Sequence, residues 1–134
     1  VYAHEREFPY LQGREPYPPA DPSVGGGLMS RLSPLYSRGP IDISEWLRPL
    51  PEDHSVPHLP SWNWIFTPGH TKGHVSFWRE SDRALLAGDA FITTRQESAY
   101  AVLVQKPEMH GPPGYFTEDW RVAEESVRTL AQLD

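Results

Sequence analysis

The sequence predicts an α/β (α+β) fold in which helices pack on a mixed β-sheet. Three short runs with strand character follow one another closely, at residues 62–66, 74–78 and 84–87. A longer stretch near the end of the chain carries apolar residues at helical spacing, at Trp120, Ala123, Val127 and Leu130. Strands followed by an amphipathic helix are typical of a sheet with at least one helix-covered face.

The first half of the chain predicts short elements. Residues 1–3 have the pattern of the end of a buried strand, and residues 4–11 that of a short helical turn that ends near Gly13. Residues 28–36 carry apolar side chains at helical spacing, cut by Pro34. Residues 41–47 alternate in a way that predicts a strand with one polar face.

Proline and glycine dominate two segments of this half, residues 9–27 and 49–60, and the whole chain contains 15 prolines. Proline at this density disfavours regular helices and central strands. Disorder is the alternative, but large apolar side chains are interleaved with the prolines. We therefore expect ordered, irregular segments that pack on the rest of the domain.

The central strands explain how distant side chains come together. In the run 74–78, His74, Ser76 and Trp78 face one way, and Val75 and Phe77 face the other. Residues 80–83 form a turn, and the wholly apolar run 84–87 predicts a strand covered on both faces. An antiparallel hairpin of these two strands brings the loop at residues 70–74 and Asp89 to the same end of the sheet.

The last helix has a clear start in the sequence. Thr117 is the predicted N-cap, and Glu118 and Asp119 in the first turn suit the helix dipole.

Two histidines and an aspartate are the main candidate functional residues of this sequence. The run TPGHTKGH places His70 and His74 on a Pro/Gly loop after one strand, and GDAF places Asp89 after another. Pro68 and Gly69 exclude a helix through His70, so the two histidines are not a helical pair. Side chains on loops held by a rigid sheet, with small neighbours that leave room for a ligand, are typical of a functional site.

The run TPGHTKGHVSFW…ALLAGDAF resembles the third and fourth metal-binding motifs of the metallo-β-lactamase-fold hydrolases, a group that includes glyoxalase II-like enzymes. The later stretch GDAFITTRQESAY…KPEMHGPPGYFTEDW resembles one subgroup of that family. The resemblance implies an αββα sandwich, with His70 as a metal ligand, Asp89 as a carboxylate that bridges two metals, and His74 as a supporting residue. It also implies Zn²⁺, two ions in the intact domain, with iron or manganese as alternatives.

The family's first ligand cluster, HxHxDH, occurs nowhere in these 134 residues, and the family's final histidine would follow the last helix. We therefore expect residues 1–134 to be one truncated domain, the central portion of a longer hydrolase. Two protein ligands leave a metal mostly hydrated, so we expect the 134 residues alone to bind metal weakly and to be inactive.

The remaining histidines have weaker contexts. His110 lies on a Pro/Gly loop, and lining of the substrate cleft and a plain surface loop remain equal alternatives for it. His4, His54 and His58 have no partner motif and are interpreted as surface or structural residues.

The resemblance implies a hydrolase in which a metal-activated hydroxide attacks the carbonyl of a small thioester, ester, lactone or amide. Two alternatives remain open. Some proteins of this fold hold iron and carry out oxygen-dependent sulfur chemistry, which metal analysis and oxygen consumption would reveal. The other alternative is a non-catalytic structural fragment that self-associates through exposed sheet edges, which concentration-dependent size would reveal.

The composition limits which classes of binding partner the sequence predicts. The formal net charge is -6, without a cluster of Lys and Arg, which argues against a nucleic-acid partner. The absence of cysteine excludes disulfides and thiolate catalysis. No apolar run is long enough to span a membrane and no leader pattern occurs in this stretch. We expect a cytoplasmic protein, although the cysteine content alone does not decide the compartment.

Overall fold

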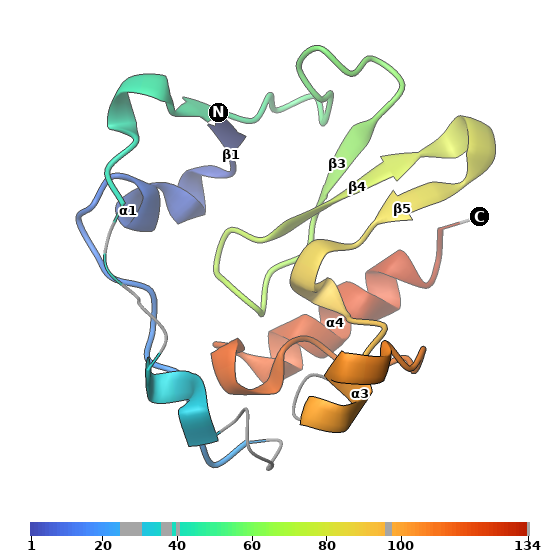
Figure 1. The fold of residues 1–134 in the computed structure, drawn as a ribbon. Coiled ribbons are helices and arrows are strands. Elements are labelled where there is room, and N and C mark those ends of the chain that lie inside the picture. Colours follow the sequence, from blue (N-terminus) through green and yellow to red (C-terminus); the bar gives the residue numbers. More distant parts are fainter. Residues whose placement is uncertain (25–30, 36–38, 40, 96–97, 134) are drawn as a thin grey trace.

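The computed structural model describes residues 1–24, 31–35, 39, 41–95 and 98–133. A three-stranded sheet occupies one side of the molecule, the helix α4 runs below it, and the N-terminal segment lies beside the sheet (Figure 1). The strands are β1 (Tyr2–Ala3), β2 (Arg48–Pro49), β3 (Asn63–Phe66), β4 (Val75–Arg79) and β5 (Ala84–Leu86), and the α-helices are α1 (Phe8–Leu11), α3 (Ala99–Val104) and α4 (Trp120–Leu130). The 3₁₀ turns are η1 (Glu5–Glu7), η2 (Ser33–Leu35), η3 (Ser44–Trp46), η4 (Glu80–Asp82), η5 (Gly88–Ala90) and η6 (Gly114–Phe116).

The sheet has the order β3-β4-β5, and both pairs of strands are antiparallel. Phe66 pairs with Val75, so the loop 67–74 closes one hairpin, and Phe77 pairs with Leu86 in the next. The loop and the residues after β5 therefore leave the sheet at the same end. Together with the parallel pairing of β1 and β2, these strands confirm the predicted mixed α/β architecture.

Helix α4 begins two residues later than the sequence predicted. Asp119 is the N-cap, and its carboxylate accepts a hydrogen bond from the Val122 amide at 3.0 Å. The Thr117 hydroxyl instead donates to the Pro113 carbonyl at 2.7 Å. The Asp119 amide, which a Thr117 cap would bind, instead donates to the Gly69 carbonyl at 3.0 Å. The predicted apolar stripe is confirmed for Ala123 and Leu130, which are buried, but is wrong for Trp120, which is 45% exposed.

The strand predicted at residues 41–47 is wrong. The Asp42 carboxylate accepts hydrogen bonds from both the amide and the hydroxyl of Ser44, at 3.0 and 2.6 Å. This side chain closes a turn that leads into η3, and such local bonds compete with a sheet ladder. Asp42 forms only an isolated antiparallel bridge with Gln12, and a strand begins at β2, where Arg48 lies opposite Tyr2 of β1.

Two predictions of burial are also wrong. Tyr2 of β1 is 44% exposed and Leu86 of β5 is 57% exposed, so neither strand is covered on both faces by the described residues. The strand predicted from residue 74 starts at Val75.

The N-terminal turns follow the sequence. Residues 5–11 form η1 and α1, and Gly13 ends this unit with a positive φ of 67°. The chain then passes through irregular conformations over residues 14–24 and, later, through turns over residues 50–60. Residues 25–27 of the Pro/Gly-rich segment, and residues 28–30 and 36 of the predicted helix, lie outside the described residues.

The described hydrophobic core connects the sheet, α1 and α4. Its buried members are Tyr10, Leu47, Leu50, Trp64, Ala90, Ala101, Tyr115, Ala123 and Leu130. Among the described residues, no helix is long and apolar enough to cross a membrane.

Gly69 makes the closest contact between the loop 67–74 and α4. Its φ is 131°, and a Cβ placed there would lie 2.4 Å from the Ala123 Cα. We expect Gly69→Ala to lower the free energy of unfolding by about 2–4 kcal/mol, because backbone strain and overpacking each cost about 1–3 kcal/mol. Urea unfolding measures this change. Gly111→Ala is the control, since its nearest contact would be 3.4 Å and its φ is not positive. Equal free energies of unfolding for the two variants would contradict the prediction that Gly69 packs too closely on α4 to carry a side chain.

Candidate metal centre

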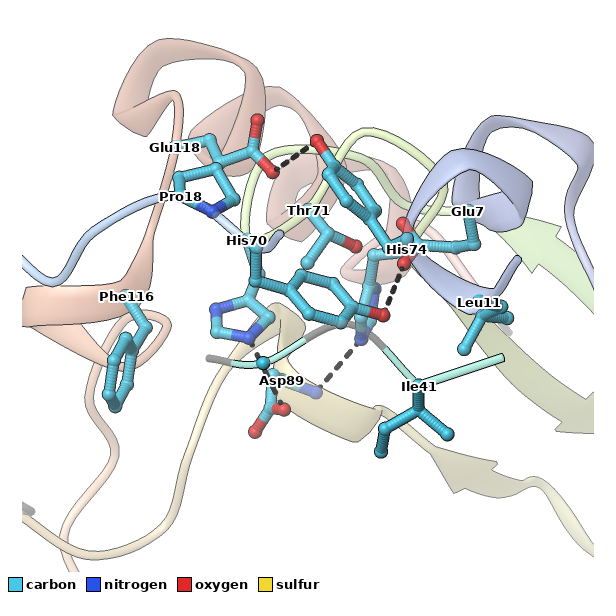
Figure 2. Close-up of a pocket in the computed structure, with 13 residues that line it drawn as sticks. Glu7, Leu11, Pro18, Ile41, His70, Thr71, His74, Asp89, Phe116 and Glu118 are labelled. Atoms are coloured by element: carbon cyan, nitrogen blue, oxygen red, sulfur yellow. Dashed lines mark hydrogen bonds and ion pairs between the residues drawn. The ribbon is translucent and has the colours of Figure 1, made fainter. Parts of the chain in front are cut away.

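The loop 67–74 and the turn η5 bring His70 and Asp89 together. The His70 Nε2 lies 3.5 Å from the Asp89 Oδ2 (Figure 2). The His70 side chain is 14% exposed, whereas that of Asp89 is 52% exposed. The pair therefore has one deeply set nitrogen donor and one carboxylate that solvent can reach.

His74 connects the two halves of this pair. Its Nδ1 lies 2.9 Å from the Thr67 carbonyl, and its Nε2 lies 2.9 Å from the Asp89 backbone nitrogen. Since an amide can only donate, Nε2 accepts, and the ring proton must be on Nδ1. His74 is thus a neutral imidazole with both nitrogens in use, and it ties the start of the loop to the residue after Gly88.

A buried chain of hydroxyls continues from His74 into the sheet. The Thr67 Oγ1 lies 2.9 Å from both the His74 Nδ1 and the Ser76 Oγ. The Ser76 hydroxyl donates to the Ala87 carbonyl at 3.0 Å, so the Thr67 hydroxyl donates to Ser76 and can accept from His74. Thr67 and Ser76 are 1% and 0% exposed. Every hydroxyl in this network has a hydrogen-bond partner, as buried polar groups require.

Helix α4 and the segment before it hold the other side of the loop. The Ser126 hydroxyl donates to the Pro68 carbonyl at 2.6 Å. The amides of Glu118 and Asp119 donate to the carbonyls of His70 and Gly69, at 3.2 and 3.0 Å. The backbone on both sides of His70 is therefore fixed from outside the loop.

The N-terminal segment also forms a hydrogen bond to the loop 67–74, through Glu7. One carboxylate oxygen of Glu7 accepts a hydrogen bond from the Gly73 amide at 2.7 Å, and the other accepts from the Tyr17 hydroxyl at 3.1 Å. The space beside Gly73 is filled by Glu7, since a Cβ there would lie 2.7 Å from the Glu7 Cγ. Only glycine permits this approach.

A cavity of about 510 Å³ opens beside the pair. Its lining includes His70, His74 and Asp89, together with side chains from the N-terminal segment and from residues 116–118. Figure 2 shows Phe116 on one side of the His70–Asp89 pair and Leu11 and Ile41 on the other. The volume is within the range of about 300–1,000 Å³ typical of small-molecule sites.

Burial keeps the histidines of the site neutral. It lowers the pKa of His70, and the nearby Asp89 carboxylate offsets part of this shift. Burial also lowers the pKa of His74, against the hydrogen bond to the Thr67 carbonyl, which raises it. Neutral imidazole is the form that binds a metal ion.

The His70–Asp89 pair fits two ligands of one metal ion. Donors about 2.0–2.2 Å from a tetrahedral zinc ion lie roughly 3.3–3.6 Å from each other, and the observed separation is 3.5 Å. The His70 Nδ1 is buried and has no hydrogen-bond partner among the described residues. Within the same part of the chain, no group of three or more His, Cys, Asp or Glu side chains could hold a metal. The described residues therefore supply two donors of a site that needs more.

His110 lies apart from this pair. It forms an isolated bridge with Ile92, and its Nε2 lies 3.5 Å from the Glu108 Oε1. It lines a separate cavity of about 420 Å³ with apolar side chains such as Phe91 and Leu130. Its role in a substrate cleft stays a prediction, as do the metal-ligand roles of His70 and Asp89.

His4 and His54 are structural. His4 caps η1 by accepting from the Arg6 amide at 3.2 Å, and its ring stacks on Phe66. His54 contacts the Trp64 carbonyl through Nδ1 at 3.0 Å and stacks on the Trp64 ring.

Sequence reasoning missed several residues that build the site. Glu7, Thr67, Ser76 and Ser126 all bond to the loop 67–74 or to the strand end beside it. Ser76 was placed correctly on the face of His74 but without a role. Glu7 and Ser126 are 66 and 58 residues from their partners, and no local pattern marks them.

The fold agrees with what the chain is similar to. It belongs to the metallo-beta-lactamase superfamily, whose family model matches residues 1–134. It is 55% identical over 134 residues to the probable metallo-hydrolase YflN of Bacillus subtilis (strain 168), covering 100% of this chain and 51% of that relative. It is 32% identical over 97 residues to the probable metallo-hydrolase YybB of the same organism, covering 72% of this chain and 36% of that relative. The chain thus spans about half the length of the first relative and about a third of the second. No solved structure matches it.

The histidines predict a pH dependence of stability. Since burial lowers the pKa of His4, His70 and His74 below the ordinary 6.5, the unfolded chain takes up protons first as the pH falls. The free energy of unfolding should therefore be greatest above about pH 6.5 and should fall as the pH drops through the lowered values.

We expect His74→Gln to flatten this slope between about pH 8 and about pH 5 in metal-free protein, measured by urea unfolding at each pH. Ser76→Ala is the control, because it breaks the hydroxyl chain but keeps the titrating ring. It should lower stability by about 1–3 kcal/mol without changing the slope. A steeper slope in His74→Gln would refute the assignment of a neutral ring.

Proposed function

We propose that this chain forms part of a metal-dependent hydrolase that acts on the carbonyl group of a small molecule. One observation carries the proposal: the His70 Nε2 and the Asp89 Oδ2 lie 3.5 Å apart on the wall of a cavity of about 510 Å³. Membership of the metallo-beta-lactamase superfamily and the similarity to two probable metallo-hydrolases support it.

His70 and Asp89 would hold the metal, with zinc as the proposed ion and iron or manganese as alternatives. A divalent metal in such a site supplies an activated water near neutral pH and an electrophile for the carbonyl oxygen. Because the described residues offer only these two donors, we infer that the other ligands come from outside them.

His74 acts as a positioning residue in this proposal. Its Nε2 accepts from the Asp89 amide, which fixes the backbone that carries the carboxylate. Its Nδ1 proton is directed to the Thr67 carbonyl, so the ring has no nitrogen left for a metal. Two histidines four residues apart thus have different tasks, one directed to the cavity and one to the scaffold.

The proposed substrates are small thioesters, esters, lactones or amides. The cavity can accept one group of such a molecule beside the pair, while the carbonyl lies at His70 and Asp89. Holding the substrate carbonyl beside the His70–Asp89 pair would lower the entropic part of the activation barrier, because the reaction would no longer require a bimolecular encounter.

Metal binding tests the ligand assignment. We expect His70→Ala and Asp89→Ala to abolish stoichiometric metal binding in the full-length protein that carries these residues. His74→Ala should weaken it by about 10–100-fold, the usual effect of losing a group that orients a ligand. Elemental analysis and chelator competition measure both.

His58→Asn is the matched control, since His58 is exposed and asparagine tolerates its positive φ of 67°. Equal metal content in the unmodified protein and in His70→Ala would contradict the assignment. Bound iron together with oxygen consumption would instead favour a sulfur oxidoreductase of the same fold.

Activity tests the reaction class. We expect the full-length protein to hydrolyse at least one thioester, ester, lactone or amide test substrate, and a chelator or Asp89→Asn to reduce the rate to the metal-only background. Glu124→Gln, on the exposed face of α4, should leave the rate unchanged. The 134 residues alone, with zinc added, should show no turnover above that background, because they supply two donors. Chelator-sensitive turnover by these residues alone would overturn the two-donor account.

A further inference from the structure

The wall of the cavity next to His70 and Asp89 is formed mainly by aromatic and aliphatic side chains. Tyr10 and Tyr17 stack on each other, with ring centres 4.5 Å apart and planes 25° apart. Both rings line the cavity, and Phe116 lines it from the segment before α4. Aromatic rings present large, rigid contact surfaces at low entropic cost, so this wall suits an apolar group.

The two tyrosines are fixed in place by carboxylates. The Tyr17 hydroxyl donates to Glu7 at 3.1 Å, and the Tyr10 hydroxyl donates to Glu118 at 3.4 Å. Tyr10 is only 3% exposed. The rings therefore form a preorganised wall, which reduces the entropy lost when a ligand binds.

Negative charge surrounds the same cavity. Glu7, Asp89 and Glu118 all line it, and among the described lining residues there is no Lys or Arg. Lys72 lies outside this lining: its Nζ is 5.9 Å from the centre of the Tyr10 ring, and it lines a different cavity with Glu118. One lysine does not balance three carboxylates.

A bound metal would neutralise Asp89, but the Glu7 and Glu118 carboxylates line the same cavity. The Gly73 amide and the Tyr17 hydroxyl stabilise the Glu7 carboxylate as a charged acceptor. A negatively charged group placed beside the tyrosines would face these carboxylates at short range, where solvent screens them less than on an open surface.

We propose that this cavity selects substrates whose group beside the scissile carbonyl is apolar and uncharged, aryl or branched alkyl, and rejects substrates that carry a carboxylate, phosphate or sulfonate there. The inference rests on the proposed function for the position of the carbonyl. It names Tyr10, Tyr17 and Phe116 as the apolar contact surface, and Glu7 and Glu118 as the groups that exclude anions.

The test compares two ligands of similar shape that are not hydrolysed, benzyl methyl sulfone and phenylmethanesulfonate. The first is neutral and the second carries one negative charge, and neither is a strong metal ligand. Dissociation constants are measured by NMR titration of the metal-loaded, full-length protein. We expect the neutral sulfone to bind at least about tenfold more tightly, as charge repulsion from two partly screened carboxylates requires.

Glu118→Gln should reduce this ratio by about threefold or more by strengthening binding of the sulfonate, with little change for the sulfone. Glu124→Gln removes a charge from the exposed face of α4 and should leave the ratio unchanged. Tyr17→Ala should weaken both ligands by about tenfold, since it removes an aromatic contact surface. Tyr17→Phe keeps the ring and should retain sulfone binding.

Equal or tighter binding of the sulfonate, an unchanged ratio in Glu118→Gln, or failure of both ligands to bind would each overturn the proposal. These outcomes do not depend on turnover. If the ratio behaves as expected but no carbonyl substrate is hydrolysed, the proposed function fails while the selective cavity stands. If hydrolysis is found but the two ligands bind equally tightly, only the proposed selectivity fails.

Discussion

The two hydrogen bonds of the His74 ring are the constraint on which the rest of the site depends. The ring lies between the Thr67 carbonyl, at the end of β3, and the Asp89 amide, beyond the end of β5. No backbone ladder joins these two points, because β4 separates β3 from β5 in the sheet. The neutral imidazole of His74, together with the hydroxyl chain from Thr67 through Ser76 to the Ala87 carbonyl, therefore helps to set the position of Asp89 relative to the loop that carries His70.

His70 and His74 differ in their surroundings, which supports the different roles proposed for them. Burial lowers the pKa of both rings, so charge does not distinguish them. Hydrogen bonding does: both nitrogens of His74 have partners, whereas the Nδ1 of His70 has none among the described residues. The hydrogen bonds of His74 hold its ring to the scaffold, whereas the His70 Nε2 faces the Asp89 carboxylate at 3.5 Å on the wall of the cavity.

Sequence reasoning reached the parts of the structure that local patterns determine. The hairpins of β3, β4 and β5, the convergence of His70 with Asp89, and the apolar face of α4 follow from alternation, glycine and helical spacing. It failed where a distant partner changes the local outcome. Thr117 has the composition of an N-cap, but the next two amides are taken by the loop 67–74, and Asp119 caps the helix instead. Glu7 and Ser126 could not be found for the same reason.

Glu7 joins the selective wall of the cavity to the loop that carries the histidines. One of its oxygens holds the Gly73 amide and the other holds the Tyr17 hydroxyl. A change at Glu7 would therefore alter the charge beside the tyrosines and release the backbone next to His74 at once. Glu118 differs, because its carboxylate contacts Tyr10 and only its backbone amide holds the loop. A side-chain substitution at Glu118 thus changes the charge of the wall while leaving the hydrogen bond from the Glu118 backbone amide to the His70 carbonyl in place.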